Sequence, residues 1–193
     1  MTLSSTRQLT LLSVLTAVCL GVQLTPRPPN VELTSLIVFL VGAVFGIPFG
    51  AGLGGLVMLI NGFFSPYGFA GLLLPFQMIG MIIMGIGGGV YGRTRENGYN
   101  MSSSIESAIG GAFLTLVYDV ITNFGVALSL WLAGTPISLA IINAIISGAP
   151  LSLVHVASNT LVFAMLFFPL TNTLQKFLRG RNGWKKEPSL TYR

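Results

Sequence analysis

The 193-residue chain is too apolar and too poor in charge for a water-soluble domain. Hydrophobic residues make up 52% and charged residues 8%, whereas soluble domains carry about a quarter charged residues. The composition therefore indicates a single integral membrane domain over residues 1–193. The net charge of +5 does not indicate nucleic acid as a partner, because the basic residues gather at the chain ends and in one internal loop.

Six apolar segments are expected to cross the bilayer as helices, since backbone groups in lipid must be satisfied within the segment. This predicts an all-α membrane protein, a compact bundle of six transmembrane helices. The segment 137–148 is apolar but too short to span comfortably, and it is expected as a short re-entrant or interfacial helix over the site. The predicted spans are approximately 8–24, 33–47, 49–64, 72–92, 104–132 and 149–170.

Small residues recur where helices are expected to approach closely. The first span carries one small-xxx-small step, Ala17 and Gly21, which suits either a partner subunit or packing within the chain. Glycines at 42, 46, 50 and 54 recur every four residues but are interrupted by Pro48. They predict two close-packed helices with glycine-lined faces rather than one continuous stripe.

The distribution of basic residues predicts the orientation. With six spans, Arg7, Arg93, Arg95 and the six cations of the tail 171–193 fall on one side, and only Arg27 falls on the other. The positive-inside rule makes the crowded side cytoplasmic, together with both termini. A seventh span would place the basic tail outside, so six is favoured.

The same orientation brings three unusual segments to the extracellular face. These are the proline-rich loop 26–30, the break 61–77 and the connection 133–149. A shared ligand site at that face is therefore expected, with the break 61–77 as one of its walls.

Two helices each present a pair of polar residues one turn apart. Asp119 is the only acidic residue deep inside a predicted span, and Asn123 follows it on the same helix face. His155 and Asn159 have the same spacing in the last span. Since a charge inside the bilayer is costly, these groups either line a cavity, with Asp119 and His155 as a hydrogen-bonded couple, or join helices by polar contacts.

The break 61–77 and the start of the second span supply the other candidates. Asn61 and Gln77 end and begin spans, and Tyr67 offers a ring for a ligand, unless it belongs to an interfacial aromatic belt. Asn30 and Glu32 either serve the start of the second helix as a cap and as a charge at its dipole, or line the site. The predicted substrate-binding set is Asn30, Glu32, Asn61, Tyr67, Gln77, Asp119, Asn123, His155 and Asn159.

The chain carries no nucleotide-binding lysine loop, no H-E-x-x-H and no G-x-S-x-G motif. A single histidine and a single cysteine, Cys19, do not supply a metal centre. We therefore expect a binding unit with no catalytic residues, cofactor or metal of its own. The alternatives are an intramembrane enzyme that uses Asp119 and His155 as an acid–base pair, and a structural subunit without a ligand.

Three strings carry a resemblance to a known family: PNVELTSLIVFLVGAVFG at 29–46, LPFQMIG at 74–80 and GAPLSLVHVASN at 148–159. Together with the six-span plan they resemble the substrate-binding membrane subunits (S components) of energy-coupling factor (ECF) transporters, over residues 10–178. The resemblance implies uptake of a vitamin or vitamin-like organic solute from the extracellular side, in the plasma membrane of a prokaryote.

The resemblance also implies partners, namely the ECF coupling transmembrane subunit and two ABC ATPases, besides membrane lipid. Ala17 and Gly21 stand where family members place the motif that meets the coupling subunit, although the usual motif has alanine at both ends. Nickel and cobalt members begin with a Met-His pair, whereas this chain begins Met1-Thr2. An organic solute is therefore expected rather than a metal ion.

Overall fold

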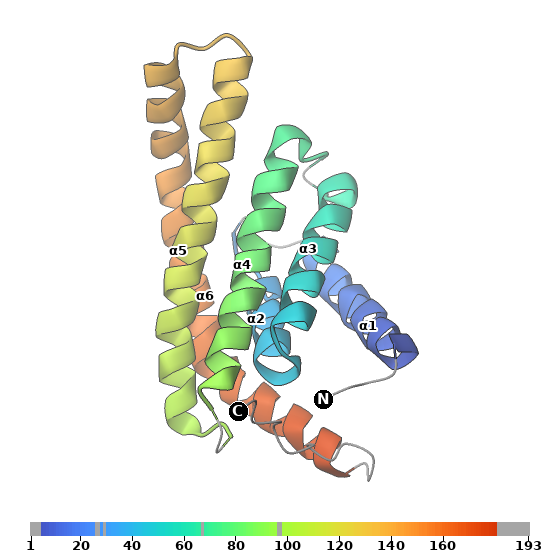
Figure 1. The fold of residues 1–193 in the computed structure, drawn as a ribbon. Helices are drawn as coiled ribbons and strands as arrows, with labels where there is room; N and C mark the ends of the chain where they lie inside the picture. The colour runs from blue at the N-terminus through green and yellow to red at the C-terminus, as the bar shows by residue number, and fades with distance from the viewer. Residues whose placement is uncertain (1–4, 26–27, 29, 67, 96–97, 181–193) are drawn as a thin grey trace, which may run out of the picture.

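The computed structural model describes residues 5–25, 28, 30–66, 68–95 and 98–180. All regular structure within these ranges is helical (Figure 1). The elements are α1 (Ser5–Leu24), α2 (Thr34–Phe45), α3 (Ile47–Phe64), the short 3-10 helix η1 (Gly71–Leu73), α4 (Leu74–Arg93), α5 (Met101–Leu132) and α6 (Ile137–Gly180).

Four of the described helices are long and apolar enough to cross a membrane. They are α3, η1 with α4, α5 and α6. The helices α1 and α2 contribute shorter apolar stretches, Leu12–Leu24 and Thr34–Phe45. A helix of 12 residues such as α2 is about 18 Å long, against a hydrocarbon thickness of about 30 Å. The prediction of an all-helical fold is confirmed for the described residues, and the four long apolar helices are compatible with a membrane protein. The number of crossings stays a prediction.

The helices α2, α3 and α4 pack backbone against backbone. Gly46 has φ 98°, which lets the chain reverse between α2 and α3 without a linker. A Cβ added at Gly50 would lie 2.6 Å from Gly42 Cα, and one added at Gly54 would lie 2.8 Å from the Met81 carbonyl carbon in α4. The prediction of glycine-lined, close-packed helices is confirmed, and α4 joins them as a third member.

Aromatic side chains also connect α2 to α6. Phe39 of α2 is buried against Phe163 and Phe167 of α6, with ring centroids 5.3 and 5.7 Å apart in edge-to-face geometry. Such pairs prefer this arrangement because the positive edge of one ring meets the negative face of the other. The buried core therefore includes residues from the long hairpin as well as from the glycine-rich helices.

The long hairpin of α5 and α6 corrects one prediction. The segment 137–148 is not a separate short helix, because it forms the first turns of a single helix that runs from Ile137 to Gly180 through Pro150 and Pro169. The last helix therefore does not begin at 149, and it continues past 170. Proline inside a membrane helix is tolerated where neighbouring helices support the backbone, and α5 runs alongside α6 (Figure 1).

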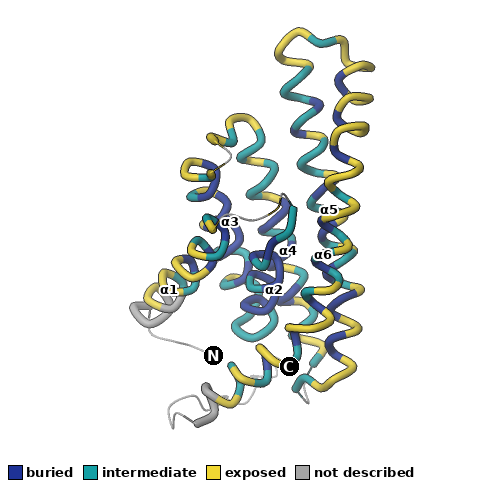
Figure 2. Tube along the Cα trace, turned by 180° about the vertical axis from the view of Figure 1, so that it is seen from behind, coloured by how far each residue is buried: buried dark blue, intermediate teal, exposed yellow. Residues whose placement is uncertain are grey.

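Small residues explain why the first turns of α6 follow α5. Ala140, Ala144 and Gly148 recur every four residues and are buried, whereas Ile145 and Ile146 between them are exposed. Small residues allow close helix approach, and the isoleucines suit lipid. The tip of the hairpin extends beyond the link between α3 and α4 (Figure 1), and much of its outer surface is exposed (Figure 2).

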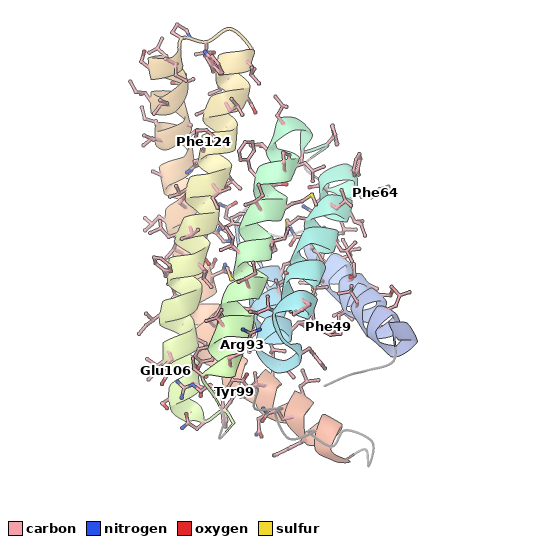
Figure 3. All side chains as sticks on the ribbon, viewed as in Figure 1. Phe49, Phe64, Arg93, Tyr99, Glu106 and Phe124 are labelled. Atoms are coloured by element: carbon pink, nitrogen blue, oxygen red, sulfur yellow. The ribbon has the colours of Figure 1, made fainter. Side chains whose placement is uncertain are left out.

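The connections between helices gather at the two ends of the bundle. The start of α1, the α2–α3 turn, the α4–α5 loop and the last turns of α6 lie at one end, and the α3–α4 link and the α5–α6 turn lie at the other (Figure 1). Tyr99 and Glu106 mark the first of these ends (Figure 3). This matches the predicted grouping of 61–77 with the turn that follows α5, whereas its extracellular location stays a prediction.

Candidate ligand-binding cavity

A cavity of about 430 Å³ lies within the bundle, and residues of α3, α4, α5 and α6 contribute to its lining. Its walls come from the loop before α2, the end of α3, the segment around η1, and the middle of α5 and α6. Of the nine residues predicted to bind substrate, seven line it: Asn30, Glu32, Asn61, Gln77, Asp119, Asn123 and His155. The structure thus brings together residues that are more than 120 positions apart in the chain.

One wall of the cavity carries three buried ionisable side chains in contact with one another. His155 Nδ1 lies 2.7 Å from Asp119 Oδ1, and His155 Nε2 lies 3.4 Å from Glu32 Oε1. Asp119 is 4%, His155 5% and Glu32 7% exposed. The predicted Asp119–His155 couple is present, and Glu32, in the loop before α2, extends it to a third segment of the chain.

Glu32 also serves the start of α2, as the alternative interpretation proposed. Its Oε1 accepts a hydrogen bond from the Ser35 backbone N–H at 3.2 Å and another from the Ser35 hydroxyl. A carboxylate near the positive end of a helix dipole is stabilised there. The helix start therefore holds Glu32 in place while the side chain faces His155.

Asn30 anchors the loop before α2 to α6. Its φ is 59°, in the left-handed region that asparagine tolerates better than most residues. The Asn30 side-chain amide donates to the Leu151 carbonyl oxygen at 3.0 Å, and the Ser158 hydroxyl donates to the Asn30 carbonyl oxygen at 3.1 Å. These two bonds position Asn30 and Glu32 beside His155.

The buried acceptor atoms of the cavity wall include Asp119 Oδ2 and Gln77 Oε1. Neither has a hydrogen-bond partner in the described part of the chain. Buried acceptors are usually paired, so each such atom calls for an explanation. A ligand that donates hydrogen bonds supplies one.

Asn123 of α5 packs against Gly148 of α6 at the cavity wall. A Cβ added at Gly148 would lie 2.6 Å from Asn123 Nδ2, so the glycine leaves space for the amide in its present position. Gly148, the last residue of the segment once expected to cover the site, is the only part of 137–148 that lines the cavity. The predicted cover is therefore replaced by a helix that runs past the site.

Four predicted residues lie away from the cavity or outside the described residues. Asn159 does not line the cavity; its side-chain amide donates to Thr115 Oγ1 at 3.0 Å, a contact between α5 and α6 that matches the helix-joining alternative. Tyr67 lies outside the described residues. Ala17 and Gly21 occupy an exposed face of α1, and a Cβ added at Gly21 would meet nothing within 4 Å.

Several lining residues were missed by the sequence reasoning. Tyr118 packs edge-on to His155 with ring centroids 5.6 Å apart. The Thr34 hydroxyl donates to Gln23 Oε1 at 2.6 Å, which places Gln23 of α1 beside the loop that carries Glu32. The other missed residues include Thr122 of α5 and Ser152 of α6.

Helix spacing was a usable signal for two of them. Thr122 follows Asp119 by three positions, and Ser152 precedes His155 by three, so each shares a helix face with a predicted residue. Phe69 lines the cavity, whereas Phe63 and Phe64 do not and are exposed. Among the described residues, no group of three or more His, Cys, Asp and Glu side chains is arranged to hold a metal ion.

Comparisons of the chain with models of protein families, with curated proteins and with solved structures gave no match.

Proposed function

We propose that the protein is the membrane-embedded substrate-capture subunit of an ECF-type ABC importer. It binds a vitamin or vitamin-like organic solute from the extracellular side and delivers it by association with a coupling membrane subunit and two ATPases. It resides in the plasma membrane of a prokaryote as a six-span bundle with both termini in the cytoplasm, and it has no catalytic step of its own.

The observation that supports this proposal is a cavity with a polar wall inside an apolar bundle. Its volume of about 430 Å³ falls in the range of small-molecule sites, which is about 300–1,000 Å³. Ionisable residues within a membrane bundle are costly and commonly mark a substrate pathway. Asp119, His155 and Glu32 meet at this wall, where a protein without a ligand gains little from three buried ionisable groups.

The exposed face of α1 suits the partner contact. Ala17 and Gly21 are exposed, and Gly21 has open space around its Cα. Small residues on an exposed helix face let a second membrane helix approach closely. The sequence left partner contact and internal packing open for this pair, and the exposure of both residues favours partner contact.

Purification from the native membrane in a mild detergent, followed by mass spectrometry of copurifying proteins, tests this function. We expect a second polytopic membrane protein and ATPase subunits to elute with the tagged protein. The Gly21→Trp variant should lose them while keeping its own yield. Elution of wild-type protein without such partners, under conditions that preserve other membrane complexes, would contradict the assignment.

The Asp119–His155 pair also favours a second candidate, an intramembrane acid–base enzyme. A histidine held by a carboxylate at 2.7 Å is a common arrangement for proton transfer. This candidate requires turnover of a lipid or prenyl substrate that disappears in Asp119→Asn while the protein stays folded. The capture subunit requires no turnover.

A further inference from the structure

The charged side chains that line the cavity are acidic, apart from one imidazole. Glu32 and Asp119 are carboxylates, His155 lies between them, and the lining contributed by the described residues includes no lysine or arginine. With both carboxylates ionised, these three side chains carry a net charge of −1 with a protonated imidazole and −2 with a neutral one. Charges interact strongly where water is excluded, so an anionic solute would be repelled and a cation attracted.

The unpaired acceptors also favour a cationic ligand. One oxygen of Asp119 is occupied by His155, and the other, Oδ2, is buried without a hydrogen-bond partner in the described part of the chain. Gln77 Oε1, on α4, is in the same situation and lines the same cavity. Both atoms accept hydrogen bonds, and the complement of two such acceptors in one cavity is a molecule that donates N–H groups.

The size and the rings of the cavity indicate an organic molecule. A volume of about 430 Å³ is many times the share of one water molecule, about 30 Å³, so a bare metal ion would leave it largely unfilled. Tyr118 and Phe69 are part of the lining. Aromatic rings attract cations through their negative faces and also pack against flat heterocycles.

We propose that the cavity selects a small organic cation with N–H donors, such as a protonated amine or a cationic nitrogen heterocycle, over a carboxylate or phosphate of similar size. The cationic N–H group binds Asp119 Oδ2, and a second donor binds Gln77 Oε1. This inference rests on the proposed capture function, because it names the chemical class of the captured solute.

The first test identifies the charge of the bound molecule. The protein is purified from its own membrane, its ligand is released by denaturation, and the extract is analysed by mass spectrometry and electrophoretic mobility. An organic cation with exchangeable N–H protons is expected. A carboxylated or phosphorylated ligand would overturn the inference while leaving the capture function intact, whereas wild-type protein without any organic ligand would overturn the capture function itself.

The second test uses defined probes and matched variants. Thermal stabilisation of protein in nanodiscs is measured with the isolated ligand and with the pair tryptamine and indole-3-propionate, which are similar in size but opposite in charge. The isolated ligand should bind about 10- to 100-fold more weakly to Asp119→Asn, since a hydrogen bond to a charged group is lost. Glu106→Gln is the control, because Glu106 pairs with Arg95 at the end of the bundle away from the α3–α4 link.

Each outcome of the second test either supports or overturns the inference that the cavity selects an organic cation. Stronger stabilisation by the amine than by the carboxylate, lost in Asp119→Asn and kept in Glu106→Gln, is the expected result. Equal stabilisation by both probes, or preference for the carboxylate, would overturn it. If Asp119→Asn does not fold, Gln77→Leu replaces it, and undiminished affinity of that variant for the isolated ligand would overturn the two-acceptor arrangement.

Discussion

Replacing His155 by leucine should destabilise the protein far more than an equivalent change on the lipid-facing side of α6. The imidazole lies between Asp119 and Glu32, at 2.7 and 3.4 Å, and all three side chains are at least nine-tenths buried. Removing it leaves two carboxylates facing each other without the group that separates them. Breaking a buried ion pair by removing one partner costs about 3–5 kcal/mol.

The assay is thermal unfolding in nanodiscs, followed by tryptophan fluorescence. For a chain of this size, 1 kcal/mol corresponds to about 2–4 °C, so His155→Leu should lower the midpoint by about 6–20 °C. Leu153→Ala is the matched control, because Leu153 lies two positions away and is 73% exposed. Its midpoint should change by less than a third of that amount.

A second substitution separates charge from packing. In Asp119→Asn/His155→Leu, one of the two stranded charges is gone, so part of the lost stability should return. A His155→Leu variant as stable as the wild type would refute the reasoning that the imidazole holds the two carboxylates. A double variant less stable than the single one would show that packing, not charge, dominates the site.

Three further predictions concern the scaffold and the partner surface. Gly50→Ala places a Cβ against backbone atoms that cannot yield, so it should destabilise by about 1–3 kcal/mol, whereas Gly110→Ala, with nothing within 4 Å, should not. Tyr99→Phe removes the hydrogen bond to the Ala43 carbonyl oxygen at 2.8 Å, for a loss of about 1 kcal/mol in chemical unfolding. Burial, and then the neighbouring Tyr91, raise the pKa of Tyr99 from 10.0 to about 12. The stability that its neutral hydroxyl contributes is therefore complete below pH 10 and is lost as the pH rises through 12. Over this pH window the free energy of unfolding should fall less in Tyr99→Phe than in the wild type. Gly21→Trp should abolish copurification of the coupling subunit without lowering the thermal midpoint, and a fall in the midpoint would indicate that this face packs within the chain.

The sequence was sufficient for the scaffold where a single physical rule applied. The glycines at 42, 50 and 54 indicated close helix packing, because a repeated lack of side chains in a membrane helix has few other uses. Asp119 and His155 stood out because ionisable groups are rare inside spans. Their hydrogen bond was predicted from that rarity, and the structure places the two side chains at hydrogen-bonding distance.

The rest depended on packing that a linear sequence does not display. Pro150 was interpreted as a helix start because proline is common there, but Ala140, Ala144 and Gly148 pack the preceding turns onto α5 and extend the helix through it. Asn159 has the same spacing as Asn123, yet it faces Thr115 rather than the cavity. Whether such a side chain faces the cavity or the neighbouring helix depends on how the two helices are rotated against each other. That rotation is set by tertiary packing.

For Glu32 the sequence allowed two interpretations, and both fit the structure. Its two interpretations, helix start and site, were treated as alternatives, whereas one carboxylate oxygen serves both Ser35 and His155. Gln23 was left out of the predicted set because nothing in its neighbourhood in the sequence connects it to Thr34, whose hydroxyl donates to its side chain.

The most direct test of the central claim, that the cavity holds a captured solute, is native mass spectrometry of the protein ejected from its own membrane. The account predicts one small organic molecule bound per chain in the wild type and in Glu106→Gln, and its loss or marked depletion in Asp119→Asn. Wild-type protein that carries only lipid, or a small molecule retained undiminished by Asp119→Asn, would contradict it.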